Sequence, residues 1–187
     1  MKDNPVLKLS LAGLLIAIGI IIPMFSPAKI VVEPASFTLA SHVAIFIAMF
    51  ISPSIAVTVA TGTTLGFFFG GFPLVVVLRA ASHVVFSLIG AIYLEIHPMT
   101  ARSAVRLRFF SFSVALVHAF CELVVVSVFY FGGNMNAAYY QNGFLLSVLS
   151  LVGIGTVIHS MIDFEIANVV VVTLQKQNLV FHREGMS

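Results

Sequence analysis

Apolar stretches long enough to cross the hydrocarbon core of a bilayer as helices recur along most of this sequence. A helix needs roughly 20 residues to cross about 30 Å of hydrocarbon. The composition agrees, because 60% hydrophobic and 9% charged residues leave too little polar surface to cover a water-soluble globule of 187 residues. The sequence therefore predicts an all-α integral membrane protein.

Proline, glycine and charged residues divide the apolar sequence into six expected spans, joined by short connections. Residues 1–187 are expected to form a single integral membrane domain, since no long polar segment is left for a second one. The spans are expected near 7–25, 36–52, 54–71, 73–95, 104–131 and 144–174.

Basic residues are unequally distributed between the two ends of these spans. An even number of spans places both termini and the fourth connection on one side, which holds Lys2, Lys8, Arg102, Arg106, Arg108, Lys176 and Arg183. Lys29 alone falls on the other side. The positive-inside rule therefore predicts cytoplasmic termini in the cell membrane, with the loops 29–33 and 134–142 facing outward.

Arg79 is the basic residue that falls within an expected span. Pro73 starts this helix at the outer face, and six residues at 1.5 Å of rise place the guanidinium roughly 9 Å inward. A cation at that depth normally faces a cavity, a partner or an anion. Because Ser82 and His83 share its helix face, we expect a clamp for a ligand carboxylate. The alternatives are snorkelling to the interface or a structural pair with Glu122.

An uncharged outer loop, residues 132–143, is dense in amide side chains and contains adjacent tyrosines. Amides can bind the polar edges of a small molecule, and a tyrosine ring can stack on a ligand ring. The alternative is a turn whose tyrosines anchor the helix ends at the interface. The expected ligand contacts in this loop are Asn134, Asn136, Tyr139, Tyr140 and Asn142.

Several histidines lie within the expected spans, at His42, His83, His118 and His159. No two of them are four residues apart and no thiolate flanks them, so the spacing favours hydrogen-bonded interior histidines over a metal site. Glu122 follows His118 by one turn, and each such pair can neutralise itself within the bundle. Asp163 stands in the same relation to His159. We expect neither a metal nor another cofactor.

A short internal match links two of the expected spans, since residues 40–43 and 81–84 both read Ala-Ser-His-Val. Both spans run in the same direction in the expected topology, and parallel repeats are common in transporters. A duplication is therefore a hypothesis. His42 joins Arg79, Ser82 and His83 among the expected ligand contacts.

Small residues four apart mark two helix faces that allow close approach. On the third span, Gly62, Gly66 and Gly70 form a face that we expect to pack within the bundle. On the first span, Gly13 and Ala17 form a shorter face that we expect to contact another protein.

Together these features resemble the substrate-binding (S) components of energy-coupling factor (ECF) vitamin transporters, and the niacin-type members most of all. The resemblance covers nearly the whole chain: it includes the short-looped spans, the basic cytoplasmic ends and the stretches ASFTLASH (35–42) and IFIAMFISP (45–53). In that family, first-helix alanines four apart contact the transmembrane coupling subunit. Gly13 and Ala17 occupy this motif here, with glycine in place of the first alanine.

The resemblance implies a subunit that binds a vitamin at its outer face and docks on a coupling subunit driven by two ATP-binding subunits. It would then topple in the membrane lipid and release the vitamin inside. Metal-transporting members use a histidine next to the initiator methionine, where this chain has Lys2, so metal transport is rejected. Thiamine-binding members use tryptophan, and the absence of tryptophan here counts against thiamine.

An outer-half arginine suits a small carboxylate, so we rank nicotinate first, pantothenate second, and hydroxymethylpyrimidine or pyridoxine third. A stand-alone proton-coupled transporter using the His118–Glu122 and His159–Asp163 pairs is a different class. An intramembrane enzyme is disfavoured, because no catalytic motif is present. A net charge of +2 without a basic run excludes nucleic acid as a partner.

Overall fold

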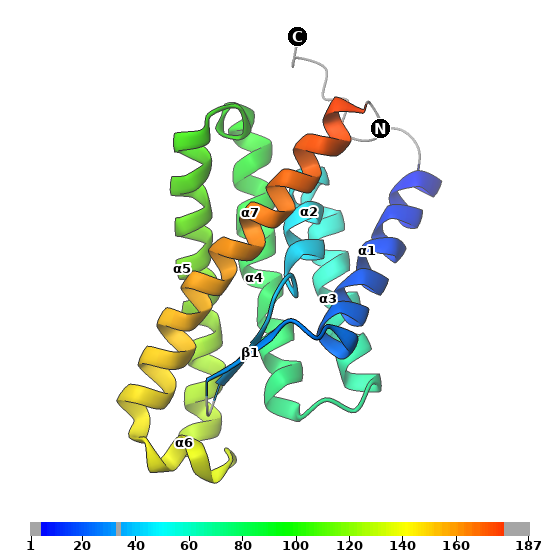
Figure 1. Ribbon diagram of the computed structural model, residues 1–187. Helices are drawn as coiled ribbons and strands as arrows, with labels where there is room; N and C mark the ends of the chain where they lie inside the picture. The colour runs from blue at the N-terminus through cyan, green and yellow to red at the C-terminus, as the bar shows by residue number, and fades with distance from the viewer. Residues whose placement is uncertain (1–4, 33–34, 178–187) are drawn as a thin grey trace.

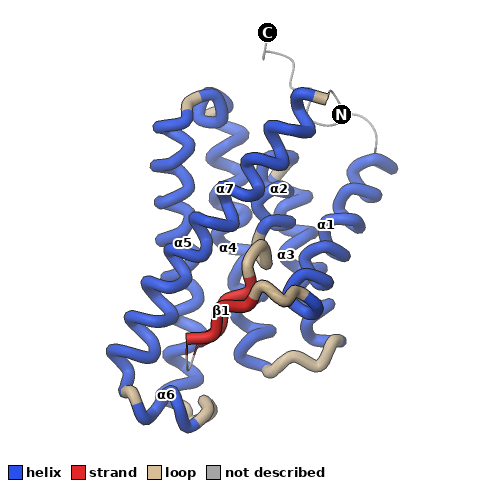
Figure 2. Tube along the Cα trace, in the orientation of Figure 1, coloured by secondary structure: helices blue, strands red, loops and turns tan. Residues whose placement is uncertain are grey.

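The structure is a computed structural model that describes residues 5–32 and 35–177. Figure 2 shows that helix makes up most of the chain, with one β-hairpin near the first helix. In chain order the elements are α1 (Pro5–Phe25), β1 (Lys29–Val32), β2 (Ala35–Thr38), α2 (Val43–Ile51), α3 (Pro53–Phe69), α4 (Leu74–Ile96), η1 (Pro98–Arg102), α5 (Ala104–Phe131), α6 (Ala137–Gln141), η2 (Leu145–Ile154) and α7 (Gly155–Lys176).

The long helices confirm an all-α membrane protein. Helices α1, α4, α5 and the continuous η2–α7 helix have 21, 23, 28 and 32 residues and are apolar enough to cross a membrane. Helix α3 is a shorter apolar helix of 17 residues. These helices match the expected spans to within a few residues at each end. The η2 part of the last one is a π-helix, a form that is frequent at functional sites.

The helix expected over 36–52 is present only in its second half, as the nine-residue α2. The residues before it form β2, which pairs antiparallel with β1 from Lys29↔Thr38 to Val32↔Ala35. Ala40 then has a φ of 68°, in the left-handed region that an α-helix cannot accommodate. Consequently α2 begins at Val43, and the turn before it brings His42 into the protein interior, with the half-buried Ser41 beside it.

This turn also rules out a structural repeat at the Ala-Ser-His-Val match. Residues 40–43 leave the turn and enter α2, whereas residues 81–84 lie in the middle of α4. The two identical tetrapeptides therefore have different backbone conformations.

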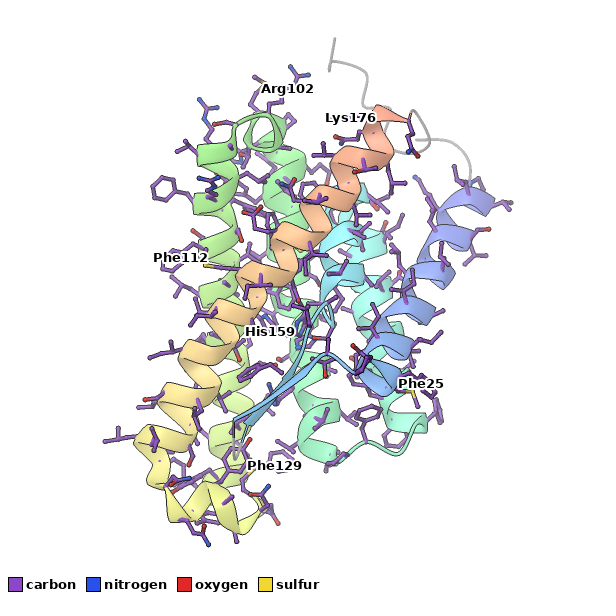
Figure 3. The ribbon with its side chains drawn as sticks, in the orientation of Figure 1. Phe25, Arg102, Phe112, Phe129, His159 and Lys176 are labelled. Atoms are coloured by element: carbon purple, nitrogen blue, oxygen red, sulfur yellow. The ribbon has the colours of Figure 1, made fainter. Side chains whose placement is uncertain are left out.

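The start of α1, the η1 turn and the end of α7 all lie at one end of the molecule, opposite α6 (Figure 1). Arg102 and Lys176 are labelled at that end in Figure 3. Lys8 on the first turns of α1 and Arg106 on the first turn of α5 belong to the same end. The fold therefore brings basic residues from α1, η1, α5 and α7 together at one end of the molecule.

Helix α2 lies in the centre of the bundle, since Val43 to Phe50 are all buried. Around it, α3 packs closely on α1: a Cβ on Gly62 would lie 2.5 Å from Ile16 Cδ1, and one on Gly66 would lie 2.2 Å from Ile20 Cδ1. Gly62 and Gly66 thus pack against α1 within the bundle, as expected, whereas Gly70 is the exposed residue that ends α3. Gly13, on α1, is exposed, and among the described residues nothing lies within 4 Å of a Cβ placed there.

Candidate functional site

A cavity of about 270 Å³ is lined by residues of α1, β2, α2, α3, α4, α5 and α7 and of the segments that join β2 to α2 and α3 to α4. Part of its wall is aromatic, formed by Phe37, Phe67 and Phe72. Pro23, Ile45, Val76 and Ala80 add apolar surface, and the other lining residues are polar. Polar side chains are costly in a membrane protein interior and mark functional sites. The polar lining residues are Thr38, Ser41, His42, Thr63, Arg79, His83, Glu122, Thr156 and His159.

Glu122, on α5, is the centre of this polar wall and is buried. Arg79 Nη2 donates a hydrogen bond of 2.9 Å to its Oε2, and Thr156 Oγ1 donates one of 2.7 Å to the same oxygen. The other oxygen, Oε1, lies 3.4 Å from His83 Nε2 and 3.5 Å from His118 Nε2. One carboxylate thereby joins α4, α5 and α7.

Four imidazole rings cluster beside Glu122. The ring centroid of His42 lies 4.8 Å from that of His83, 4.7 Å from that of His118 and 5.0 Å from that of His159. All four side chains are buried. The rings come from α4, α5, α7 and the residue before α2, so the cluster exists only in the folded bundle.

Asp163, on α7, holds the turn that delivers His42. The N–H of Ala40 donates to its Oδ1 at 2.7 Å, and the N–H of His42 donates to its Oδ2 at 2.9 Å. His42 Nδ1 lies 3.1 Å from the same Oδ2. Ser41 Oγ and His159 Nε2 are 3.0 Å apart, which ties the turn to α7 a second time.

Comparison with known proteins identifies a relative. Niacin transporter NiaX of Lactococcus lactis subsp. cremoris (strain MG1363) is 41% identical to this chain over 166 residues, which are 89% of this chain and 73% of the relative. The chain belongs to the niacin transporter family. It is a multi-pass transport protein of the cell membrane, and its resemblance to niacin-type proteins is confirmed. No protein-family model and no solved structure matches the chain.

Three of the ligand contacts that the sequence of this chain predicts line the cavity: Arg79, His42 and His83. Ser82 is not among the described lining residues, and its hydroxyl donates to the carbonyl of Arg79 at 2.7 Å on its own helix. The structural pair of Arg79 with Glu122, which the sequence left open, is formed.

The expected contacts in the outer loop do not line this cavity in the part of the chain that the structure describes. Their side chains bond within the loop: Asn134 Nδ2 donates to Gly132 O at 2.9 Å, and Asn136 accepts the N–H of Tyr139 at 3.4 Å as the cap of α6. Tyr140 donates to Tyr130 O at 3.1 Å.

Asn142 and Tyr139, the other predicted ligand contacts in this loop, also make contacts near the loop. Asn142 Nδ2 donates to Ala138 O at 3.4 Å. Tyr139 is buried, in a small cluster with Val126, Val148 and Val152. The loop side chains therefore hold α6 against the ends of α5 and η2.

Sequence reasoning did not select Thr63, Glu122, Thr156 or His159 as cavity residues. Glu122 and His159 each stood in an i, i+4 pair that was interpreted as neutralising itself. The sequence did contain one indication that Glu122 lines the ligand site. Glu122 lies in the middle of its helix, and when α4 and α5 run antiparallel it lies at the same depth in the membrane as Arg79. That geometry would have placed the carboxylate in the ligand wall.

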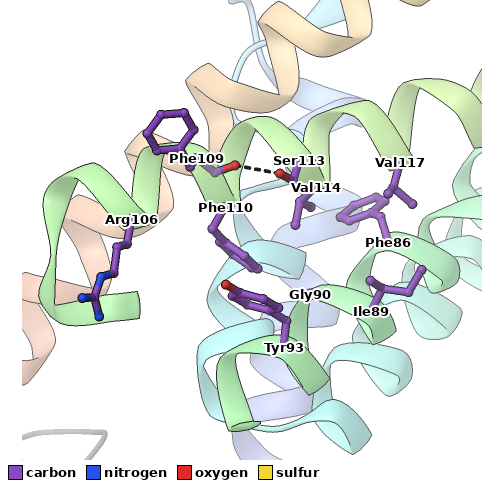
Figure 4. A pocket seen from close by; sticks show the side chains of 10 residues that line it. All are labelled: Phe86, Ile89, Gly90, Tyr93, Arg106, Phe109, Phe110, Ser113, Val114 and Val117. Carbon is purple, nitrogen blue, oxygen red and sulfur yellow. Dashed lines mark hydrogen bonds between the residues drawn. The ribbon is translucent and has the colours of Figure 1, made fainter. Parts of the chain in front are cut away.

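A second cavity, of about 290 Å³, lies between α4 and α5 near Arg106 (Figure 4). Tyr93 and Phe110 stack at its centre with ring centroids 5.3 Å apart. Ser113 donates to the carbonyl of Phe109 on its own helix at 2.9 Å, so its hydroxyl is already paired. Its described polar lining residues are Tyr93, Arg106 and Ser113, against nine in the first cavity, so the first cavity is the candidate ligand site.

Proposed function

We propose that this protein is the S component of an ECF transporter and binds nicotinate in the cavity beside Glu122. The observation that carries this proposal is a partly aromatic cavity with an arginine on its wall. Ligand sites of this kind combine an apolar lining with a few polar groups that fix orientation. Membership of a family that includes a niacin transporter supports the choice of vitamin.

Arg79 serves as the carboxylate anchor while Glu122 holds it in place. A guanidinium has five N–H donors, and the bond to Glu122 uses one of them. The buried Nε of Arg79 has no hydrogen-bond partner among the described residues. The pair with Glu122 and the binding of a ligand carboxylate are therefore compatible.

The remaining wall suits a single aromatic ring. Phe67 and Phe72 stack on each other with centroids 4.6 Å apart, and Phe37 lies 5.5 Å from His159 between ring centroids. Thr63 Oγ1 is buried without a partner in the described residues, so it can donate to a ring nitrogen. At about 270 Å³ the cavity is small for a ligand site. It suits a pyridine carboxylate better than the longer, flexible pantothenate.

The transport cycle follows the resemblance. The basic end carrying Lys8, Arg102 and Lys176 would face the cytoplasm. The exposed Gly13 and its neighbour Ala17 would contact the transmembrane coupling subunit, which two ATP-binding subunits drive. Uptake by the purified chain alone, driven by a proton gradient without ATP, would contradict this assignment.

Binding calorimetry with nicotinate and its amide tests the site. Arg79→Ala should lower nicotinate affinity about tenfold to a hundredfold, because a charge-assisted hydrogen bond contributes roughly 1.5–3 kcal/mol. Arg79→Lys should also weaken binding, since lysine lacks the planar fork. The amide should bind the native protein weakly and lose little more when Arg79 is removed.

Arg106→Ala is the matched control, because Arg106 is exposed and lines the second cavity. It should leave nicotinate affinity unchanged. Equal binding of acid and amide by the native protein would show that Arg79 does not bind the carboxylate. Mass spectrometry of small molecules that copurify with the protein would then identify the ligand directly.

A further inference from the structure

Three imidazoles and one carboxylate converge at the wall of the cavity. His42, His83, His118 and Glu122 each offer one ligand atom, all of these atoms lie within 4.8 Å of one another, and all four residues are buried. We propose that these four side chains bind one divalent transition-metal ion, Zn²⁺ or an ion of similar chemistry. Imidazole nitrogen and carboxylate oxygen are the donors that Zn²⁺ takes in four-coordinate sites.

The distances suit a shared ion better than direct hydrogen bonds. Glu122 Oε1 lies 3.4 Å from His83 Nε2 and 3.5 Å from His118 Nε2, both longer than the 2.7–3.2 Å of an ordinary N–H···O bond. In a tetrahedral zinc site with bonds of about 2.0–2.1 Å, neighbouring ligand atoms are roughly 3.3 Å apart. The Glu122–His83 and Glu122–His118 pairs are already near this spacing, and contraction of the remaining pairs, which lie within 4.8 Å, would bring all four donors onto one ion.

In three of the four proposed ligands, the nitrogen or oxygen that would not bind the metal already has a hydrogen-bond partner. His42 Nδ1 lies 3.1 Å from Asp163 Oδ2, His118 Nδ1 lies 3.2 Å from Ser160 Oγ, and Oε2 of Glu122 accepts two hydrogen bonds. Metal-binding histidines typically donate their second nitrogen to such a partner, which orients the ring. His118 Nε2 is the matching unpaired atom: it is buried and has no hydrogen bond within the described ranges.

The charges also favour a cation. The cluster contains the carboxylates of Glu122 and Asp163 but only one permanent cation, Arg79, which leaves an excess of one negative charge in the membrane interior. A second grouping, His42 with His159 and Asp163, is less suitable. Both oxygens of Asp163 already accept backbone N–H groups, at 2.7 and 2.9 Å.

The histidines share no helical spacing, so the site depends on contacts between helices. Four protein ligands fill a tetrahedral site, as in structural zinc sites. The ion would fasten α4 and α5 to the turn before α2, at one wall of the vitamin cavity. Its expected role is to hold that wall in shape.

Metal content of the purified full chain tests the proposal. The protein is prepared with an affinity tag that contains no histidine, dialysed against a chelator, and then titrated with Zn²⁺ or Co²⁺ in the absence of vitamin. We expect about one ion per chain by elemental analysis, an absorption spectrum typical of tetrahedral Co²⁺, and a higher melting temperature with metal. His118→Ala and His83→Ala should each lower metal affinity on the order of a hundredfold or more.

His97→Ala is the matched control, since His97 is exposed at the end of α4 and outside the cluster. It should bind metal as the native protein does. Should the ligand variants fail to fold, Ser160→Ala provides the test, because loss of the partner of His118 should weaken binding about tenfold to a hundredfold. Absence of metal binding by the native chain, or equal loss in His97→Ala, would overturn the site. Either result would leave the proposed vitamin binding untouched, because the metal titrations contain no vitamin.

Discussion

Glu122 and Asp163 are two buried carboxylates with the same local sequence relation and different surroundings. Each follows a histidine by four residues on a long helix, and each is almost completely inaccessible, at 2% and 0% exposure. Glu122 is bonded by side chains, those of Arg79 and Thr156. Asp163 is bonded mainly by backbone, through the N–H groups of Ala40 and His42.

The difference assigns the two carboxylates different roles: Glu122 belongs to the ligand-binding network, and Asp163 stabilises the fold around it. A side-chain network such as that of Glu122 can exchange partners when a ligand enters. Backbone N–H groups cannot turn away, and if buried without a partner they destabilise the fold. Asp163 therefore supports the unusual turn at Ala40, and through it positions His42, whereas Glu122 sets the polarity of the cavity.

Asp163→Ala should have the largest effect on stability. It removes hydrogen bonds from two backbone N–H groups and from the His42 ring, and leaves the His42 groups buried and the N–H of Ala40 partly buried without this partner. Breaking a buried charged network typically costs about 3–5 kcal/mol. For a chain of this size, the melting temperature in detergent should fall by about 6 to 20 °C.

Glu165→Ala is the control, because Glu165 lies on the same helix two residues later and is exposed. Its melting temperature should match that of the native protein. Similar losses in the two variants would mean that charge on α7, and not the turn before α2, accounts for the effect.

Thr156→Val should have a smaller effect, because it removes one hydrogen bond from the Glu122 network and preserves side-chain shape. A hydrogen bond to a charged group contributes about 1.5–3 kcal/mol, which corresponds to a melting temperature about 3 to 12 °C lower. Thr173→Val is the control: Thr173 is exposed on α7, and its hydroxyl bonds the carbonyl of Val169. A loss for Thr156→Val as large as that for Asp163→Ala would remove the distinction between the two carboxylates.

The sequence was sufficient to place the long helices. The expected span 104–131 coincides with α5, because Ser103 caps its first turn by accepting the N–H of Arg106 and Gly132 ends it. The hairpin and the short α2 were missed for a physical reason. Nothing in the local sequence shows that Ala40 adopts a left-handed conformation, since that conformation is stabilised by Asp163, more than a hundred residues away.

The site was predictable only in part, for the same reason. Arg79 was selected because a cation within a membrane span is costly and, without knowledge of any partner, already indicates a functional site. Glu122 was paired with His118 on its own helix, or with Arg79 as an alternative, although its nearest partner is Thr156 on α7. Contacts between helices, which create the cluster, have no periodic signal in the sequence.

The last prediction concerns a surface remote from both carboxylates, where substitution should change neither ligand binding nor stability. Gly13 is exposed on α1, and no described residue of another element lies within 4 Å of a Cβ placed there. Gly13→Trp should therefore leave nicotinate affinity and the melting temperature as in the native protein. If α1 docks on a coupling subunit as proposed, the substitution should nevertheless reduce that assembly, because a bulky side chain on a close-approach face separates two helices.

Coprecipitation with the coupling subunit and ATP-driven uptake measure this effect. Ala17→Trp, one turn further along α1, should act in the same direction. Leu14→Trp is the matched control, since Leu14 is exposed at the same depth but points about 100° away around the helix. Assembly lost equally in Leu14→Trp would mean that the whole exposed side of α1 tolerates no added bulk. If Gly13→Trp instead lost nicotinate binding together with assembly, then α1 would act on the cavity, which contains its Pro23, and the separation between partner surface and ligand site would be wrong.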